Sequence, residues 1–369
     1  MHQPTIGSMN FSGQSTINPS LRSLYPLIYK LHKGNTVDID QATKYFGKTL
    51  HDKLYQHCVN LMKKYKYLTK LEVSYLHATL SGIVNMLNKQ DNTLMNFIPD
   101  NTVSEVSSVA KGIVDIQQLR VIDVLDHLYT VYHNRGIQGL RVESILKKAS
   151  IISQGGINAE TSIEYKVYDI MEVIINELEY GNWCTSSKSE TDCLFYWKNI
   201  LHIISERRMI HKKGELTSTA TKFERVINEY EFGETNKNVS GRKIDLLIQT
   251  TSVNIQNKPE VFDLSSMEFK KSGSDDIYLI SQQNKNIRTM KSVLASLLAT
   301  TNHIDVVLGM DIVGVSGYMF AVLPYEGVTF ATNVTDDKIV FLPVNKYDLD
   351  DFLDKKKYVL PLLFTYKVK

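Results

Sequence analysis

The spacing of apolar residues changes along the chain at about residue 233. Before that point, apolar side chains recur every three or four positions, which is the period of an amphipathic helix. The clearest stretch covers residues 163–178, and similar spacing predicts helices near residues 50–65, 68–87 and 117–133. No fixed-length repeat is present, so a solenoid is not expected.

Polar stretches divide the chain into three parts. Residues 1–18 are rich in Ser, Asn, Gln and Gly and are expected to form a disordered tail. Residues 19–185 form the helical part, and the polar segment 181–190 predicts its boundary. The remaining residues, 186–369, are expected to form a second domain.

The second domain combines the periods of helices and strands. It begins with a helix at residues 191–208, followed by a short helix that starts at Gly214 and ends near residue 230. A long helix is then expected at residues 276–298, between strands at 242–250, 261–271, 304–309, 317–323, 328–333 and 338–343. This order predicts an α/β sandwich with a mixed sheet after an all-helical N-terminal region, so the fold class is α+β or α/β.

Two of the predicted strands carry charges where a buried strand is usually apolar. Asp245 lies in the segment GRKIDLLI, and Glu268 and Lys270 lie in the segment LSSMEFKK. Side chains two apart on a strand point the same way, so Glu268 and Lys270 share a face, and Phe269 points into the opposite layer. An acid on each of two neighbouring strands, with a lysine beside them, would form a compact cation site.

This arrangement resembles the PD-(D/E)XK nuclease superfamily, whose signature is an acid on one core strand and an acid-x-lysine on the next. Asp245 matches the first acid, Glu268 the second and Lys270 the lysine, whereas Ile244 stands where the superfamily's name has proline. Residues 214–320 also look like a group of uncharacterised fungal proteins associated with this superfamily. The resemblance is limited to the C-terminal part and implies a restriction-endonuclease-like fold.

Phosphodiester cleavage requires a strong nucleophile and stabilisation of charge on the phosphate, and a divalent cation supplies both. Mg²⁺, or Mn²⁺ in its place, prefers oxygen ligands, so Asp245 and Glu268 are the expected metal ligands. Lys270 would orient or deprotonate the attacking water, or offset charge on the phosphate. The resemblance implies that a backbone carbonyl near Phe269 adds a further ligand.

The resemblance also implies roles for two helices. A third acid is expected on the helix before the sheet, where Glu215 is preferred over Glu224. The helix after the third strand should supply polar groups beside the site, and the candidates for nucleic-acid binding are Gln282, Gln283, Lys285 and Arg288. Three of these four step by three positions and form one ridge. The two cations among them suit phosphate contacts.

Composition narrows the cellular setting. The chain has 369 residues, a net charge of +2 and 43% hydrophobic residues, as in a soluble globular protein without a global basic field. Its cysteines, Cys58, Cys184 and Cys193, suit a reducing compartment, and no paired C-x-x-C spacing supports a zinc site with His202. No run of 18 apolar residues and no secretory signal is present, so we expect no membrane contact and an intracellular location, nuclear or cytoplasmic.

The sequence therefore predicts a metal-dependent nuclease that hydrolyses phosphodiester bonds, with DNA as the expected partner. Two alternatives stay open: a catalytically inactive nuclease-like module that binds nucleic acid, and an adaptor that binds a protein partner through an apolar patch on its N-terminal helices. In a plainer interpretation, Asp245 lies at an exposed strand end, and Glu268 and Lys270 form a solvent-facing ion pair.

Overall fold

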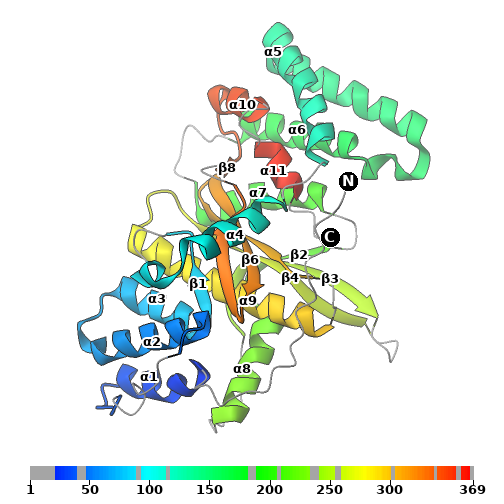
Figure 1. The fold of residues 1–369 in the computed structure, drawn as a ribbon. Helices are drawn as coiled ribbons and strands as arrows, with labels where there is room; N and C mark the ends of the chain where they lie inside the picture. The colour runs from blue at the N-terminus through cyan, green and yellow to red at the C-terminus, as the bar shows by residue number, and fades with distance from the viewer. Residues whose placement is uncertain are drawn as a thin grey trace.

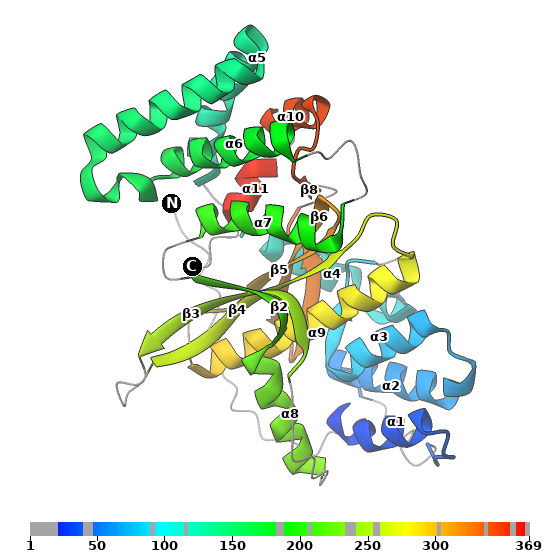
Figure 2. The same ribbon diagram turned by 180° about the vertical axis from the view of Figure 1, so that it is seen from behind.

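A computed structural model describes most of the chain, and within it helices cover both faces of a central sheet (Figures 1 and 2). The described residues are 21–39, 47–88, 93–113, 117–181, 188–205, 209–232, 241–253, 259–300, 304–335, 339–354 and 359–365. The tail expected at residues 1–18 lies outside them. The architecture confirms the α+β class and a mixed sheet.

The sheet has the strand order β1-β7-β6-β5-β4-β3-β2, and β8 pairs with β6. The pairs β1–β7 and β4–β5 are parallel, and the remaining pairs are antiparallel. The strands are β1 Ile83–Asn85, β2 Met209–Thr217, β3 Lys243–Val253, β4 Pro259–Lys270, β5 Val307–Val313, β6 Ser316–Tyr325, β7 Val328–Asn333 and β8 Val340–Phe341.

The N-terminal region supplies one edge strand of this sheet. β1 follows a turn at Gly82, whose φ is 71°, and pairs in parallel with β7, with Ile83 opposite Thr329. The expectation of an all-helical N-terminal region is therefore wrong. The helix predicted at residues 68–87 ends at Leu80, because the β-branched Ile83 and Val84 pair with β7 instead. The domain boundary near residue 185 stays a prediction.

One face of the sheet is covered by α9 (Asp276–Thr300), which contacts β4, β5 and β6. α3 (Lys70–Leu80) and α8 (Thr219–Phe232) pack against α9, as Figure 2 shows. The helix predicted at residues 276–298 is thus confirmed. Apolar side chains of α9 such as Ile287 are fully buried, and each such burial stabilises the fold by roughly 1.5–3 kcal/mol.

The other face carries α7 (Glu190–Ile204), which contacts β4. α6 (Ile163–Tyr180) packs against α7 and against the long α5 (Gln117–Gly155), and the apolar stripe predicted on α6 is buried. Gly136 interrupts α5, because its φ of 64° and ψ of −164° are not helical. α5 and α6 form an arm that extends away from the sheet (Figure 1).

Shorter helices complete the two layers. They are α1 Tyr25–His32, α2 Leu50–Lys63, α4 Asp100–Lys111, α10 Lys346–Leu353 and α11 Val359–Thr365, with 3-10 turns at Leu21–Leu24, Tyr65–Tyr67, Thr93–Phe97 and Gly156–Thr161. Capping boxes fix the starts of α2 and α3, where Thr49 and Thr69 accept bonds from the backbone of Asp52 and Glu72. Within the described residues, no helix has the length and apolar character needed to cross a membrane.

Candidate active site

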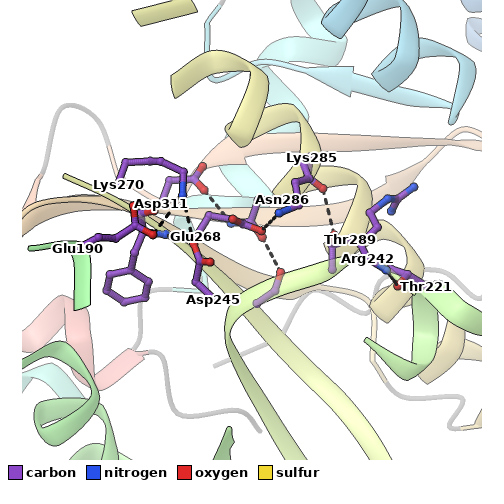
Figure 3. A network of polar contacts seen from close by, with 12 residues as sticks. Glu190, Thr221, Arg242, Asp245, Glu268, Lys270, Lys285, Asn286, Thr289 and Asp311 are labelled. Atoms are coloured by element: carbon purple, nitrogen blue, oxygen red, sulfur yellow. Dashed lines mark hydrogen bonds and ion pairs between the residues drawn. The ribbon is translucent and has the colours of Figure 1, made fainter. Parts of the chain in front are cut away.

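Three neighbouring strands bring three acids to one region of the sheet (Figure 3). Leu246 of β3 pairs with Met267 of β4, which places Asp245 next to Glu268 across the antiparallel pair. On the other side of β4, Glu268 pairs with Asp311 of the parallel strand β5. Since residues opposite each other on adjacent strands share a face, the three carboxylates gather on one side of the sheet.

Lys270 joins the acids from β4 itself, two positions after Glu268 on the same face. Its Nζ lies 3.3 Å from Asp245 Oδ2 and 3.6 Å from Glu190 Oε1 at the start of α7, and it also donates to the Phe269 carbonyl. Burial lowers the pKa of Lys270, but the carboxylates, Asp245 foremost, outweigh this and raise it above its ordinary value. The amine therefore stays charged at neutral pH.

Asp245 is held by the backbone of the facing strand. The Phe269 N–H donates to its Oδ2 over 2.9 Å, while the Phe269 side chain is buried on the opposite side. The Asp245 side chain is 27% exposed, so solvent reaches this carboxylate. Glu268 and Lys270 are only 2% and 8% exposed, which excludes the interpretation of a solvent-facing pair on an edge strand.

Glu268 is the least exposed of the three acids, at 2% against 8% for Asp311. Lys285 of α9 places its Nζ 2.8 Å from Glu268 Oε1. Neither carboxyl oxygen accepts a hydrogen bond of standard geometry from any described residue. Burial, followed by the charge of Asp245, raises the pKa of Glu268 to about 8, although Lys285 opposes the shift.

Asp311 is a site residue that the sequence did not predict. Asn286 Nδ2 and the Tyr318 hydroxyl each donate to it over 2.8 Å. Burial raises the pKa of Asp311 to about 6, against these two donors. The strand expected at residues 304–309 stops short of Asp311, yet a charge inside an apolar strand is the same signal that identified Asp245.

The four candidates for nucleic-acid binding on α9 do not all lie at the carboxylate site. Lys285 reaches the carboxylates, and Gln282 and Gln283 line the cavity above them. Gln283 is also a structural link, because its side-chain oxygen accepts bonds from Asn85 and Asn88 of the N-terminal region over 3.0 and 2.7 Å. The remaining candidate, Arg288, lies one turn along α9, on the side of α1 and α8.

Glu215 lies on a strand rather than on the expected helix, so this part of the prediction is wrong. Residues 209–217 form β2, whose pairing with β3 is irregular between Lys213 and Leu216, beside Asp245. The side chain of Glu215 lies outside the described residues. The weaker candidate, Glu224, is on α8, where it accepts a bond from Ser292 of α9.

A cavity of about 340 Å³ opens onto Glu268 and Asp311, and Asp245 lies outside its lining. Its lining includes the acids Glu268, Asp276 and Asp311, the cation Lys270, and the hydroxyl-bearing Tyr318. The cavity is formed between β4, β5, β6 and the first turns of α9. Charged groups of both signs therefore converge on a space that a small charged group could enter.

Carboxylate oxygens are the kind of donor that a hard divalent cation prefers. Within the described part of the chain, no three His, Cys, Asp or Glu side chains form a cluster that could hold a metal. The protein ligands would be the two carboxylates of Asp245 and Glu268, which is the usual number for Mg²⁺ with water in the other positions. The Phe269 carbonyl, expected as a further ligand, accepts a bond from Lys270 instead.

Comparisons with known proteins do not assign this chain to a family. No family model matches it, no curated protein matches it, and no solved structure matches it. The case for its function therefore depends on the geometry of the site.

Proposed function

We propose that this chain is a metal-dependent nuclease with a restriction-endonuclease-like domain, and that its substrate is DNA. The observation that carries the proposal is the state of Glu268. This carboxylate is 2% exposed, accepts no regular hydrogen bond among the described residues, and lies between Asp245 and Lys285. Because its pKa is about 8, this carboxyl group is largely protonated at neutral pH in the metal-free chain, and a divalent cation added beside Lys285 would favour its ionised form.

Asp245 and Glu268 would hold the cation, which when bound would activate water and neutralise charge on the phosphate. The Phe269 N–H fixes one oxygen of Asp245 and thereby orients the carboxylate. The partial exposure of Asp245 lets ligand water and substrate approach from solvent.

Lys270 and Asp311 would have complementary roles in the reaction. Because its pKa is raised, Lys270 is charged at neutral pH, which suits stabilisation of negative charge on the phosphate better than removal of a proton from water. Asp311 has a pKa of about 6 and lines the same cavity. A carboxylate that titrates near neutral pH is suited to accept a proton from the attacking water.

The test compares cleavage of supercoiled plasmid and single-stranded DNA in Mg²⁺, in Mn²⁺ and in EDTA. The variants are Asp245→Ala and Lys270→Ala, and the matched control is Glu260→Gln, which changes an exposed acid on β4, the strand of Lys270. We expect wild type and control to cleave only with metal, and the two site variants to lose activity by about 100-fold or more. Equal cleavage by all four proteins would indicate a contaminant and remove the assignment.

One observation favours the inactive binding module instead. Glu268 is paired with Lys285, and Asp245 with Lys270, so two lysines already offset two carboxylates. A site of this kind balances its charges without metal. The same experiment separates the two functions, because DNA binding that weakens with salt but never leads to metal-dependent cleavage would favour the module.

The adaptor alternative is favoured by a different part of the molecule. Four large apolar side chains of α5 are between 46% and 61% exposed, and they are Val142, Ile145, Leu146 and Ile152. An exposed apolar row on a helix is typical of a protein-binding surface. This surface lies on the arm that extends from the sheet (Figure 1) and does not compete with the carboxylate site.

A further inference from the structure

A second polar cluster lies between α1, α8 and α9. Arg242, directly before β3, donates its backbone N–H to Thr221 Oγ1 of α8 over 2.7 Å (Figure 3). One turn later on α8, Glu224 accepts a bond from Ser292 of α9. The Ser292 hydroxyl also lies 3.0 Å from the carbonyl oxygen of Arg288, one turn earlier on α9. Arg242 and Arg288 are therefore both anchored within one helical turn of the Glu224–Ser292 contact.

Among the residues that the structure describes, positive charge exceeds negative charge in this cluster. Arg242 and Arg288 are half-buried, and among the described residues Arg242 Nη1 and Arg288 Nε are buried without a hydrogen-bond partner. Burial, followed by the charges of Arg288 and Arg225, lowers the pKa of Arg242 to about 10, whereas Glu224 and Tyr25 oppose this shift. Two half-buried guanidinium groups beside one described carboxylate are costly unless an anion joins them.

Two further titratable groups beside the cluster, Tyr25 and His77, carry no negative charge that would repel an anion. Tyr25 of α1 has a pKa raised by burial, so its hydroxyl stays protonated, and it lies 3.5 Å from the Ser81 hydroxyl. His77 of α3 has a pKa lowered by burial to about 4, with the charge of Arg288 as a further cause, so it is neutral. Arginine is well suited to phosphate because its planar group offers several N–H donors at once.

We propose that Arg242 and Arg288 form a phosphate-binding site next to the carboxylate site. Arg288 lies three positions after Lys285 on α9, a rise of about 4.5 Å along the helix, and Lys285 contacts Glu268. This inference rests on the proposed function: in a nuclease, the site would hold a backbone phosphate of the substrate next to the phosphate that is cleaved. A free phosphate or nucleotide shares this chemistry, and the experiment distinguishes the sources.

In the first measurement, the full chain is titrated with inorganic phosphate in an isothermal titration calorimeter. The variants are Arg242→Gln and Arg288→Gln, and the control is Arg120→Gln, which removes an exposed arginine of α5. We expect wild type and control to bind phosphate equally, and each site variant to bind at least about tenfold more weakly. Equal affinity in all four proteins would overturn the site.

If a glutamine variant fails to fold, the variant Arg288→Lys keeps the charge but loses the planar group. It should bind phosphate more weakly than wild type, and unchanged affinity would argue against the site.

The second measurement uses the variant Asp245→Asn, with cleavage disabled, and follows binding of a short single-stranded DNA by fluorescence anisotropy. Adding Arg288→Gln to this protein should weaken DNA binding by at least about tenfold, and free phosphate should compete with the DNA. DNA binding that is insensitive to both would overturn the assignment of a substrate phosphate. The phosphate titration needs no catalysis, so a chain that never cleaves DNA would fail the proposed function without failing the site.

Discussion

The carboxyl group of Glu268 couples the stability of the fold to pH. An ordinary glutamate in the unfolded chain releases its proton near pH 4.5, whereas burial and the adjacent Asp245 raise the pKa of Glu268 to about 8 in the folded chain. Between these values the unfolded state binds fewer protons, so stability falls as pH rises and stops falling above about pH 8. Asp311 adds an effect of the same sign between pH 3.8 and about 6.

We therefore expect the contribution of Glu268 to the stability of the metal-free protein to fall from pH 5 to pH 8, while His57 and His77, whose pKa values burial lowers to about 4, act in the opposite direction below about pH 6.5. Glu268→Gln should decline less steeply and should exceed wild type at pH 8 by an amount on the order of a few kcal/mol. The measurement is chemical denaturation in EDTA across this range. The control Glu260→Gln, on an exposed position of β4, should keep the wild-type slope. If Glu268→Gln keeps that slope as well, Glu268 is not the group that titrates.

Single charges in apolar strands were the informative signal at this scale. Asp245, Glu268 and Lys270 were predicted from that signal, and the register places them together. Asp311 carries the same signal but was missed. Gly309 and Met310 precede it and have weak strand preference, so the strand was predicted to end at residue 309 instead of Val313. The contact between Lys285 and Glu268 could be predicted only as a general position on α9, because it depends on how the helix crosses the sheet.

At the scale of elements, Gly136 determines the shape of α5. Its φ of 64° and ψ of −164° lie in a region that residues with a side chain rarely adopt. A Cβ there would meet no atom within 4 Å, so any effect of a substitution comes from the backbone alone. The direction of the arm thus depends on one residue.

We expect Gly136→Ala to lower the free energy of unfolding by about 1–3 kcal/mol, measured by urea denaturation. Gly112→Ala is the matched control, because Gly112 ends α4 with an ordinary φ of −67° and ψ of −12°. The control should change stability by less than about 1 kcal/mol. Equal losses in both variants would contradict a role of the positive φ.

Elements were predictable where the apolar period is long, as in α6 and α9, and not where pairing decides the structure. β1 has only three residues, and from sequence alone they are predicted to be the end of a helix. They form a strand because they pair with β7. β2 contains His211, Lys212, Lys213 and Glu215, so it carries little strand signal, and the helix was placed too early. Tertiary contacts override local preference in both segments.

At the scale of the whole molecule, the arm formed by α5 and α6 presents its apolar row to solvent. Three residues of this row, Val142, Ile145 and Ile152, together with the exposed Ala149, are spaced by three, four and three positions, which is the spacing of a coiled-coil seam. These four positions carry no charge, so a second copy of the chain could pack against the row without repulsion.

We expect the purified chain to self-associate at high concentration, as measured by analytical ultracentrifugation. Ile145→Glu should shift the association to concentrations at least about tenfold higher, because a buried charge opposes the seam. Val109→Glu, at another exposed apolar residue on α4, should behave as wild type. A wild-type chain that stays monomeric throughout would exclude a second copy as the occupant of the row.

The parallel pairing of β1 with β7 has a consequence for the order in which the chain is completed. Ile83 pairs with Thr329, so the partner is synthesised 246 residues later (329 − 83). At about 5–20 residues per second, translation needs roughly 12–50 s to cover that interval. During this time the nascent Ile83–Asn85 segment has no ladder to join. A ribosome-bound chain therefore carries an unpaired strand segment until Val328–Asn333 has emerged, and that is the period in which a chaperone would be needed.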